Sequence, residues 1–326
     1  MLQRDRDTVV SVVMAGRDDN YGNLSEVGIR DLAFTPIPYI DRLANSIEKF
    51  DDGFKHHGIP AEIVIVDWSP SSLLLDNSTI SNICQGKNVK FVVVTKSMVR
   101  KMKFNPSGFD EFFAKNIGIR SAIGRYLLLT NSDAWPDSEL FASIASFINS
   151  DFSTFYGRPF NRIDLDSTNS PSGEGLTFNY NDIDGTLGTA AAGDFVLTHR
   201  TNILSVGGYN EAGTRKSTKT RQAGIDGQLL MNLYLQGIHP KKMAGSVLTY
   251  DHNKIQRNDY GVPRESCLNK STWGLSNVAK EFLTDNALIV NHVTLKTRCQ
   301  RIHSALIRKF STVIFMLKIH RARSLR

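Results

Sequence analysis

The chain has 326 residues, of which 41% are apolar and 22% charged, the composition of an ordinary globular protein that can bury a substantial core. Its three cysteines lie far apart, which excludes a disulfide framework and a zinc-finger pattern and favours a reducing compartment. There is no run of about 18 apolar residues, so no membrane-spanning helix is expected. The short apolar stretch 9–15 is followed at once by charged residues and suits a buried strand better than a signal peptide. We therefore expect a cytoplasmic protein.

The formal net charge of +7 is concentrated at the C-terminus. From Val290 onward there are nine Lys or Arg and no Asp or Glu, whereas the preceding 289 residues hold 30 basic and 32 acidic groups. This asymmetry argues against a broad nucleic-acid-binding face, so we expect no nucleic-acid partner. Residues 306–326 mix basic and apolar side chains, which suits either a helix lying on an anionic membrane surface or a helix docked on protein.

Segments typical of strands and helices alternate through the first half. Apolar runs without alternation suit parallel strands covered on both faces, and they occupy residues 8–15, 61–68, 90–95 and 125–130. Between them, residues 38–55 and 109–123 place apolar side chains at helical spacing, and a glycine follows each segment. This order predicts a doubly wound α/β sheet.

The second half is less regular. Residues 161–190 are rich in Ser, Asn, Asp, Gly and Thr without periodicity, and predict a long loop. We then expect, in chain order, a strand over 189–200, a flexible basic stretch over 211–224, a helix over 225–237 and a strand over 245–253.

Polar residues directly follow three of the predicted strands, at the sheet edge where open α/β sheets bind their ligands. The three ends are Ala15 to Asp19, Asp67 to Pro70, and Asn131 to Asp133, and each carries polar or acidic residues. One such end is unremarkable because strands stop at turn residues, whereas three at neighbouring edges indicate a ligand site.

A glycine-rich phosphate loop is absent from the sequence. Neither GxxxxGK[ST] nor GxGxxG follows the first predicted strand. A divalent cation is the usual substitute, because phosphoryl oxygens and carboxylates complete its shell, and Asp133 is the obvious ligand.

The segment 112–140, FFAKNIGIRSAIGRYLLLTNSDAWPDSEL, resembles the middle of GT-A glycosyltransferases of the family 2 type. Those enzymes follow an A-[RK]-N-x-G-x-x-x-A-x-G helix with an apolar strand and a D-x-D or related acidic turn. Segments 10–22, 62–70, 193–211 and 224–237 also match in order, so the resemblance covers about residues 8–255. The residues in register are Ala114, Lys115, Asn116, Gly118, Ala122, Gly124 and Asp133.

The resemblance implies a GT-A fold, with a doubly wound, mixed, mainly parallel sheet flanked by helices. It implies one domain over residues 1–260, with a nucleotide-binding half at 8–130 and a metal and acceptor half at 131–260. A basic helical extension over 261–326 would follow. The implied reaction is the inverting transfer of a sugar from a nucleotide-diphosphate donor to a saccharide or lipid-linked acceptor, as in surface polysaccharide or glycolipid assembly.

On the donor side the resemblance implies that Asp67 bonds the base and that the backbone of Ala15 to Arg17 lines the same pocket. Lys115 and Ser132 would lie near the donor. Asp133 would ligate Mn²⁺ or Mg²⁺ on the diphosphate.

For the remaining groups the resemblance implies Asn131 and His252 as further metal ligands. Asn131 replaces the first acid of D-x-D, so one charge is lost and a metal-poor mechanism stays open. Asp226 would be the general base, and Gly193 and Asp194 would shape the acceptor side. The loop 161–190 and the basic segment 213–221 are candidates to cover the donor or to contact an anionic acceptor.

Each of these residues also has an ordinary structural explanation. Asp226 could cap its helix, Asp67 could serve a turn, Lys115 could be solvated and His252 could lie in a surface loop. For the whole chain the alternatives are a non-catalytic nucleotide-sugar-binding or scaffold protein of GT-A fold, which Asn131 favours, and a nucleotidyltransferase. The latter needs a glycine-rich basic loop after the first strand, which the sequence matches poorly.

Overall fold

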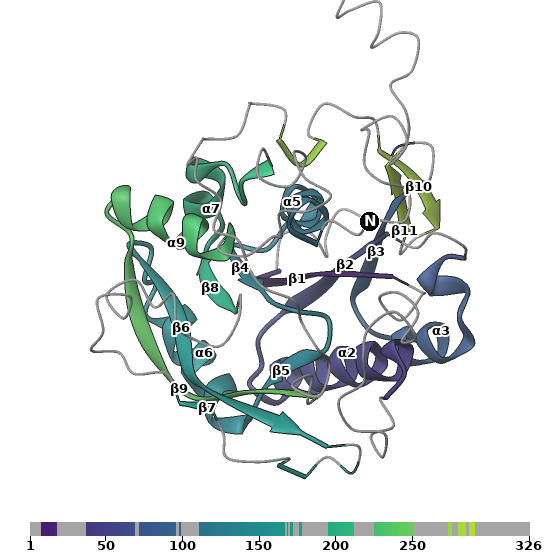
Figure 1. Cartoon of the computed structure of the whole chain (residues 1–326), viewed down its shortest axis with the longest axis horizontal. Coiled ribbons are helices and arrows are strands. Elements are labelled where there is room, and N and C mark those ends of the chain that lie inside the picture. Colours follow the sequence, from purple (N-terminus) through teal and green to yellow (C-terminus); the bar gives the residue numbers. More distant parts are fainter. Residues whose placement is uncertain are drawn as a thin grey trace, which may run out of the picture.

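The computed structural model describes residues 8–17, 37–68, 72–95, 98, 111–166, 168, 170–171, 176–177, 195–211, 225–250, 273–275, 280–284 and 287–290. Within these ranges, helices cover both faces of one mixed sheet (Figure 1). This architecture agrees with the expected α/β sheet flanked by helices. None of the helices in these ranges is long and apolar enough to cross a lipid bilayer.

The first half confirms the predicted alternation of strands and helices. The elements are β1 (Val10–Gly16), α2 (Tyr39–His56), β2 (Ala61–Asp67), the 3-10 helix η1 (Leu74–Asp76), α3 (Ser78–Cys84), β3 (Val89–Val94), α5 (Glu111–Ser121) and β4 (Tyr126–Leu129). Both long helices begin and end within two residues of the predicted limits, because their apolar spacing and flanking Pro and Gly residues are local signals.

The second half adds shorter strands and helices. They are β5 (Ala134–Pro136), α6 (Ser138–Asn149), β6 (Phe155–Leu165), β7 (Leu176–Thr177), β8 (Val196–His199), α7 (Arg200–Val206), α9 (Ile225–Leu235), β9 (His239–Tyr250), the 3-10 helix η3 (Trp273–Leu275), β10 (Lys280–Thr284) and β11 (Ala287–Val290).

One sheet joins the described strands in the order β10-β11-β3-β2-β1-β4-β8-β6-β9-β5, and β7 pairs with β6. The strands from β11 to β4 are parallel to one another. β8 runs antiparallel to β4, so the direction changes there. The parallel part therefore carries its carboxyl ends at one edge, where the predicted site residues follow the strands.

Three expectations for the second half were wrong. Residues 161–165, expected in a loop, continue β6 because they pair with β9 as far as Leu165↔Tyr250. β9 begins at His239 rather than at 245, also through pairing with β6. Residues 280–284 and 287–290, expected in a helical extension, form two strands, since β11 pairs in parallel with β3. In each case a distant partner strand decided the structure, and local composition does not encode it.

Two apolar cores lie on opposite faces of the sheet. Alternate side chains of β1 enter different cores: Val12 and Met14 pack with α2 and α6, while Val13 and Ala15 pack with α5. Successive side chains of a strand point to opposite faces, so a strand covered on both sides must be apolar throughout. This explains the continuous apolar runs of the central strands.

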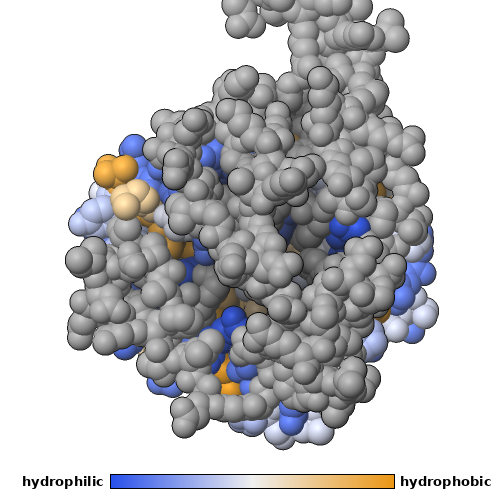
Figure 2. Space-filling model, viewed as in Figure 1, coloured by the Kyte–Doolittle hydropathy of each residue, from blue (hydrophilic) through white to orange (hydrophobic). Residues whose placement is uncertain are grey.

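The few exposed large apolar side chains of the described chain gather at the end of α9. Met231, Tyr234 and Leu235 are 43%, 38% and 72% exposed. Figure 2 shows an orange patch at the upper left, in the region of the end of α9.

Close packing explains two glycines of the 112–140 motif. A Cβ at Gly118 would lie 2.6 Å from Val13 Cγ1, so a side chain there would push α5 off the sheet. A Cβ at Gly124 would lie 2.5 Å from the backbone nitrogen of Ser11, in the turn between α5 and β4. Both positions therefore need glycine for helix and strand to approach each other.

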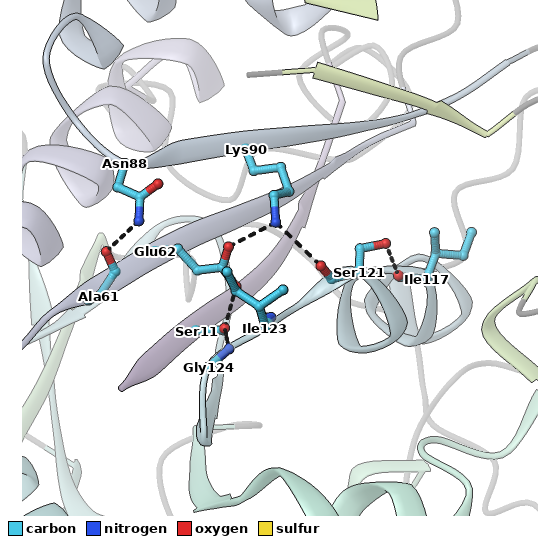
Figure 3. A network of polar contacts seen from close by, with 9 residues as sticks. All are labelled: Ser11, Ala61, Glu62, Asn88, Lys90, Ile117, Ser121, Ile123 and Gly124. Atoms are coloured by element: carbon cyan, nitrogen blue, oxygen red, sulfur yellow. Dashed lines mark hydrogen bonds and ion pairs between the residues drawn. The ribbon is translucent and has the colours of Figure 1, made fainter. Parts of the chain in front are cut away.

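A buried polar network fixes the same turn (Figure 3). The Glu62 carboxylate is 1% exposed and accepts hydrogen bonds from Ser11 Oγ at 2.5 Å and from the Ile123 amide at 2.7 Å. Lys90 Nζ donates to its other oxygen at 3.0 Å, and the Gly124 amide donates to Ser11 Oγ at 2.8 Å. The buried charge is thus paired and hydrogen-bonded, as a carboxylate in an apolar sheet requires.

We expect Gly124→Ala to destabilise the protein by about 2–3 kcal/mol, because the new methyl group overlaps backbone that cannot move aside. Urea denaturation measures the change. In a Ser11→Ala background, Gly124→Ala should lower the unfolding free energy by the same amount, because the atom nearest to the new methyl group is the backbone nitrogen of residue 11. A cost that disappears in that background would show that only the Ser11 hydroxyl is in the way.

The N-cap of α7 predicts a pH dependence of stability. His199 Nδ1 accepts from the Thr201 amide, and burial lowers the pKa of His199 below its usual range. At acidic pH the unfolded chain therefore binds more protons at His199 than the folded protein does. The contribution of neutral His199 to the unfolding free energy is fully present above the unfolded pKa of about 6.5, and it is lost as pH falls through the lower folded pKa.

His199→Asn keeps a capping acceptor and removes the titration. Between about pH 7.5 and about pH 5 the wild type should therefore lose more unfolding free energy than the variant. Parallel urea titrations at the two pH values measure this difference. Equal losses in both proteins would contradict the assignment.

Candidate functional site

The carboxyl ends of β1, β2 and β4 meet at one edge of the sheet. Gly16 pairs with Asp67 across β1 and β2, and Val13 pairs with Leu129 across β1 and β4. The predicted residues at these ends are buried: Ala15, Arg17, Asp67 and Ser132 are 2%, 6%, 1% and 2% exposed. The structure therefore brings together the three polar strand ends.

Asp67 serves a turn, which is its ordinary structural explanation. Its Oδ2 accepts a hydrogen bond from the Leu74 amide at 2.7 Å, at the start of η1. The Trp68 amide donates to the Gly16 carbonyl at 2.9 Å and continues the pairing of β1 with β2 past Asp67. The carboxylate is thereby fixed beside the end of β1. Contact of Asp67 with a nucleotide base stays a prediction.

Tyr39, on the first turn of α2, links the end of β1 to the turn after β4. Its hydroxyl donates to Ser132 Oγ at 2.9 Å, and a Cβ at Gly16 would overlap that hydroxyl. Burial raises the pKa of Tyr39 well above its usual range, so the phenol stays neutral and keeps its proton for this bond. Gly16 is thus required by the phenol that packs against it.

Asp133 is paired with Arg42, one helical turn after Tyr39. The Arg42 Nη1 to Asp133 Oδ2 distance is 2.5 Å, and the two side chains are 11% and 13% exposed. The main chain of this turn is held as well, because Thr249 Oγ1 donates to the Asp133 carbonyl at 3.1 Å and Ser46 Oγ to the Ala134 carbonyl at 3.2 Å. α2 and β9 therefore hold the turn from two sides.

Lys115 reaches the same turn from α5. It is fully buried and donates to Glu111 Oε1 at 2.7 Å and to Asn131 Oδ1 at 2.9 Å. The solvated-lysine explanation is therefore wrong, and the structure brings Lys115 to the D-x-D-like turn. The Asn131 carbonyl, predicted as a metal ligand, accepts from this ammonium group.

Asn116, the next residue on α5, ties the 209–211 segment to the helix. Its Nδ2 donates to the Tyr209 carbonyl at 2.8 Å and to Glu211 Oε1 at 3.1 Å, while its Oδ1 accepts from the Tyr209 amide at 2.8 Å. Glu211 Oε1 also accepts from the Gly274 amide at 2.7 Å, which fixes η3. Sequence reasoning matched Asn116 in the motif but assigned it no role.

Asp226 lies in the first turn of α9, where its Oδ1 accepts from the Gly227 amide at 2.9 Å. Burial raises the pKa of Tyr209 well above its usual range, and the negative charges of Asp226 and Glu111 raise it further. Both carboxylates therefore act on the Tyr209 phenol through their charge.

Three predicted residues, Gly193, Asp194 and His252, lie outside the described residues, as do the basic segment 213–221 and the tail 306–326. Their described neighbours border the same edge. β8 begins with Val196 opposite Leu129, the last residue of β4. Near the end of β9, Thr249 pairs with Ala134, directly after the turn.

The described side chains at this turn do not by themselves fit a divalent cation. The Asp133 carboxylate is ion-paired with Arg42, and the Asn131 carbonyl accepts from Lys115. Among the described residues, no group of three or more His, Cys, Asp or Glu could hold a metal ion. Oxygen-rich sites for Mg²⁺ or Mn²⁺ use carboxylates that face the ion, not ones already paired with a cation.

No protein-family model matches the sequence, and no curated protein does. Among solved structures, TarS 1–349 of S. aureus is 16% identical and covers 74% of this chain and 60% of its own, with a TM-score of 0.47. Its complex with UDP is 13% identical, covers 75% and 61%, and has a TM-score of 0.44. Its complex with UDP-GlcNAc is 15% identical, covers 80% and 60%, and has a TM-score of 0.41. The chain thus spans about three fifths of those TarS chains, and at such values the likeness carries no functional argument.

The buried Lys115 pair yields a stability prediction. Lys115→Met keeps the length of the side chain but leaves Glu111 without its counter-ion, which should cost about 3–5 kcal/mol in urea denaturation. Lys55→Met is the matched control, because Lys55 also bonds an acid four residues earlier at 2.7 Å but is exposed. We expect no measurable change there. Equal effects of the two substitutions would contradict a structural role for Lys115.

Proposed function

We propose that this chain is a glycosyltransferase that moves a sugar from a nucleotide-diphosphate donor to an acceptor hydroxyl. One observation carries the proposal: Lys115 of α5 joins Glu111 to Asn131 in the turn after β4, which is the place that the family 2 motif assigns to the donor diphosphate. The motif itself and the parallel strand ends support the same reading.

The donor would lie across the carboxyl ends of β1, β2 and β4. Asp67 would accept from the base, and the backbone of Ala15 to Arg17 would line its pocket. Ser132 and Lys115 belong to the diphosphate side, where Lys115 acts as a positioning residue because it is buried against Asn131. Rigid supports of this kind fix polar groups before the ligand arrives.

In the proposed reaction the acceptor oxygen attacks the anomeric carbon of the donor. A new bond forms between this carbon and the acceptor oxygen, and its bond to the diphosphate oxygen breaks with the electron pair leaving on the diphosphate. Asp226 would take the acceptor proton, a role that requires a carboxylate within hydrogen-bond reach. In-line attack from the face opposite the leaving group inverts the configuration.

The acceptor side would be formed by Gly193 and Asp194, and the acceptor would be a saccharide or a lipid-linked sugar. A lipid-linked acceptor would suit attachment of the basic tail to a membrane surface. A divalent cation bound by Asp133, Asn131 and His252 stays a prediction from the motif. Because the described side chains do not fit such an ion by themselves, no step is derived through it.

Calorimetry with a panel of UDP-, GDP- and dTDP-sugars tests the donor class. We expect one nucleotide to be preferred, because its base is read at the ends of β1 and β2. Slow release of the nucleoside diphosphate from the bound donor should accompany binding. Binding without any release would favour the non-catalytic nucleotide-sugar-binding alternative, and the absence of binding across the panel would contradict the donor site.

Asp226→Asn tests the base. The amide keeps the size of the side chain and its bond to the Gly227 amide but cannot accept the acceptor proton, so turnover should fall by about 10²–10⁴-fold. The dissociation constant of the donor should not change, because Asp226 is placed on the acceptor side. Asp52→Asn on the exposed face of α2 is the control and should leave both quantities unchanged. Wild-type turnover in Asp226→Asn would show that Asp226 is not the base.

A further inference from the structure

The 209–211 segment joins two helices of the proposed site. It bonds α5 through Tyr209 and Glu211, and it bonds α9 through Asn210. We propose that this segment sets the position of α9 relative to α5, so that Asn210 and Gln228 are positioning residues for the proposed base, Asp226. The inference rests on the proposed function and adds how the base is held in place.

The attachment to α5 is made by a buried side-chain amide. Asn116 is fully buried and bonds both main-chain groups of Tyr209, because its Oδ1 accepts from the amide and its Nδ2 donates to the carbonyl, each at 2.8 Å. The buried Tyr209 ring packs on Phe112, one turn earlier on the helix, with the ring centroids 4.9 Å apart. Two main-chain bonds and a ring contact therefore fix the start of the segment against α5.

Two glycines at the end of α7 lead the chain to this contact. Gly207 and Gly208 have φ of +78° and +71°, and the Gly208 amide donates to the Ile203 carbonyl at 3.1 Å. A Cβ at Gly208 would lie 2.4 Å from Asn116 Oδ1 and 2.6 Å from the Trp273 ring. Backbone conformation and space thus both require glycine at 208. The turn after α7 is built for a close approach to α5.

Glu211 anchors the other end of the segment. Its Oε1 accepts from Asn116 Nδ2 at 3.1 Å and from the Gly274 amide at 2.7 Å. Trp273, the residue before this glycine, is buried and contacts the Arg120 guanidinium, whose central carbon is 4.0 Å from the ring centroid. Both neighbours of residue 210 are therefore bonded to α5, so its side chain reaches α9 from a fixed position.

Asn210 carries the attachment to α9. Its side chain is 4% exposed, and its Nδ2 donates to Gln228 Oε1 at 2.9 Å. Gln228 stands two residues after Asp226 in the same helix. Residues two apart on a helix point to different sides, so this bond holds the helix without using the side that carries Asp226.

The sequence of α9 explains why a directional contact is needed there. Six of the seven residues 229–235 are apolar and are distributed around nearly the whole helix. The buried face holds Leu229, Leu230 and Leu233, and the exposed face holds Met231, Tyr234 and Leu235. Because apolar burial has no direction, rotation of this helix would exchange one apolar face for another. A hydrogen bond depends on direction and selects one rotation.

The rotation of α9 decides where the base lies. Helical Cα atoms are about 2.3 Å from the axis, so a rotation of about 30° moves each of them by about 1.2 Å. A displacement of about 1 Å at a catalytic group can lower the rate by about a hundredfold, because a general base must lie within hydrogen-bond reach of the proton that it accepts. The bond between Asn210 and Gln228 would therefore act on the rate through Asp226.

The test measures single-turnover release of the nucleoside diphosphate from the donor that the wild type prefers in the UDP-, GDP- and dTDP-sugar panel. Gln228→Met removes the acceptor of the Asn210 bond and keeps the length of the side chain. It should lower the rate by about tenfold to a hundredfold and leave the dissociation constant of the donor unchanged. Asn232→Met is the control, because it places the same side chain one turn later on the same helix, outside the pair. It should change neither quantity.

An Asp226→Asn background separates positioning of the base from a general structural role. If Gln228 acts through Asp226, Gln228→Met should lower the rate no further in that background. In the same way, Asn210→Leu combined with Gln228→Met should be no slower than the slower of the two single variants. Rates are measured well below the melting temperature of each variant, so that loss of folding is not counted as loss of rate.

The outcomes are distinguishable. A wild-type rate in folded Gln228→Met overturns the inference, and so does an equal loss of rate with and without Asp226→Asn. Both results leave the proposed function standing. A wild-type rate in Asp226→Asn overturns the proposed base, and absence of binding across the donor panel overturns the proposed donor site. The inference falls with either.

Discussion

The central strands are buried on both faces, and this constraint decides where chemistry can occur. β1, β2 and β4 lie between two apolar cores, so their interior has no room for an unpaired polar group. Polar side chains are displaced to the strand ends or, like Glu62 with Ser11 and Lys90, become fully paired. A hydrogen-bonded network thus stabilises the amino end of the parallel strands. The polar groups that could bind a ligand lie at their carboxyl end.

The turn after β4 shows how firmly such an end can be held. Three elements bond this turn through their side chains. Helix α2 contributes Tyr39, Arg42 and Ser46, helix α5 contributes Lys115, and strand β9 contributes Thr249. Five side chains from three elements thus bond the four consecutive residues 131–134. This degree of support is typical of sites where a small displacement changes binding or rate.

Much of the first half could be predicted from the sequence, because apolar runs, helical spacing and flanking glycines are local signals. The site was predicted only in part. Asp67, Lys115 and Asp133 came from the motif, but Arg42 stands 91 residues from Asp133, and nothing around it marks it as a partner. Pairings of β6 with β9 and of β11 with β3 were missed for the same reason. Helix α6 could have been found, since Asp137 accepts from the Leu140 amide as an N-cap and an apolar run follows.

The parallel pairing of β11 with β3 has a consequence for how the chain is made. β3 buries five of its side chains, Val89 and all four from Phe91 to Val94, and without β11 its backbone would form the open edge of a strongly apolar sheet. Such an edge invites pairing with other chains. During synthesis, most of the sheet leaves the ribosome well before residues 287–290 do. The strand that covers this edge of β3 is therefore among the last of the described strands to be synthesised, and the edge stays without this partner until then.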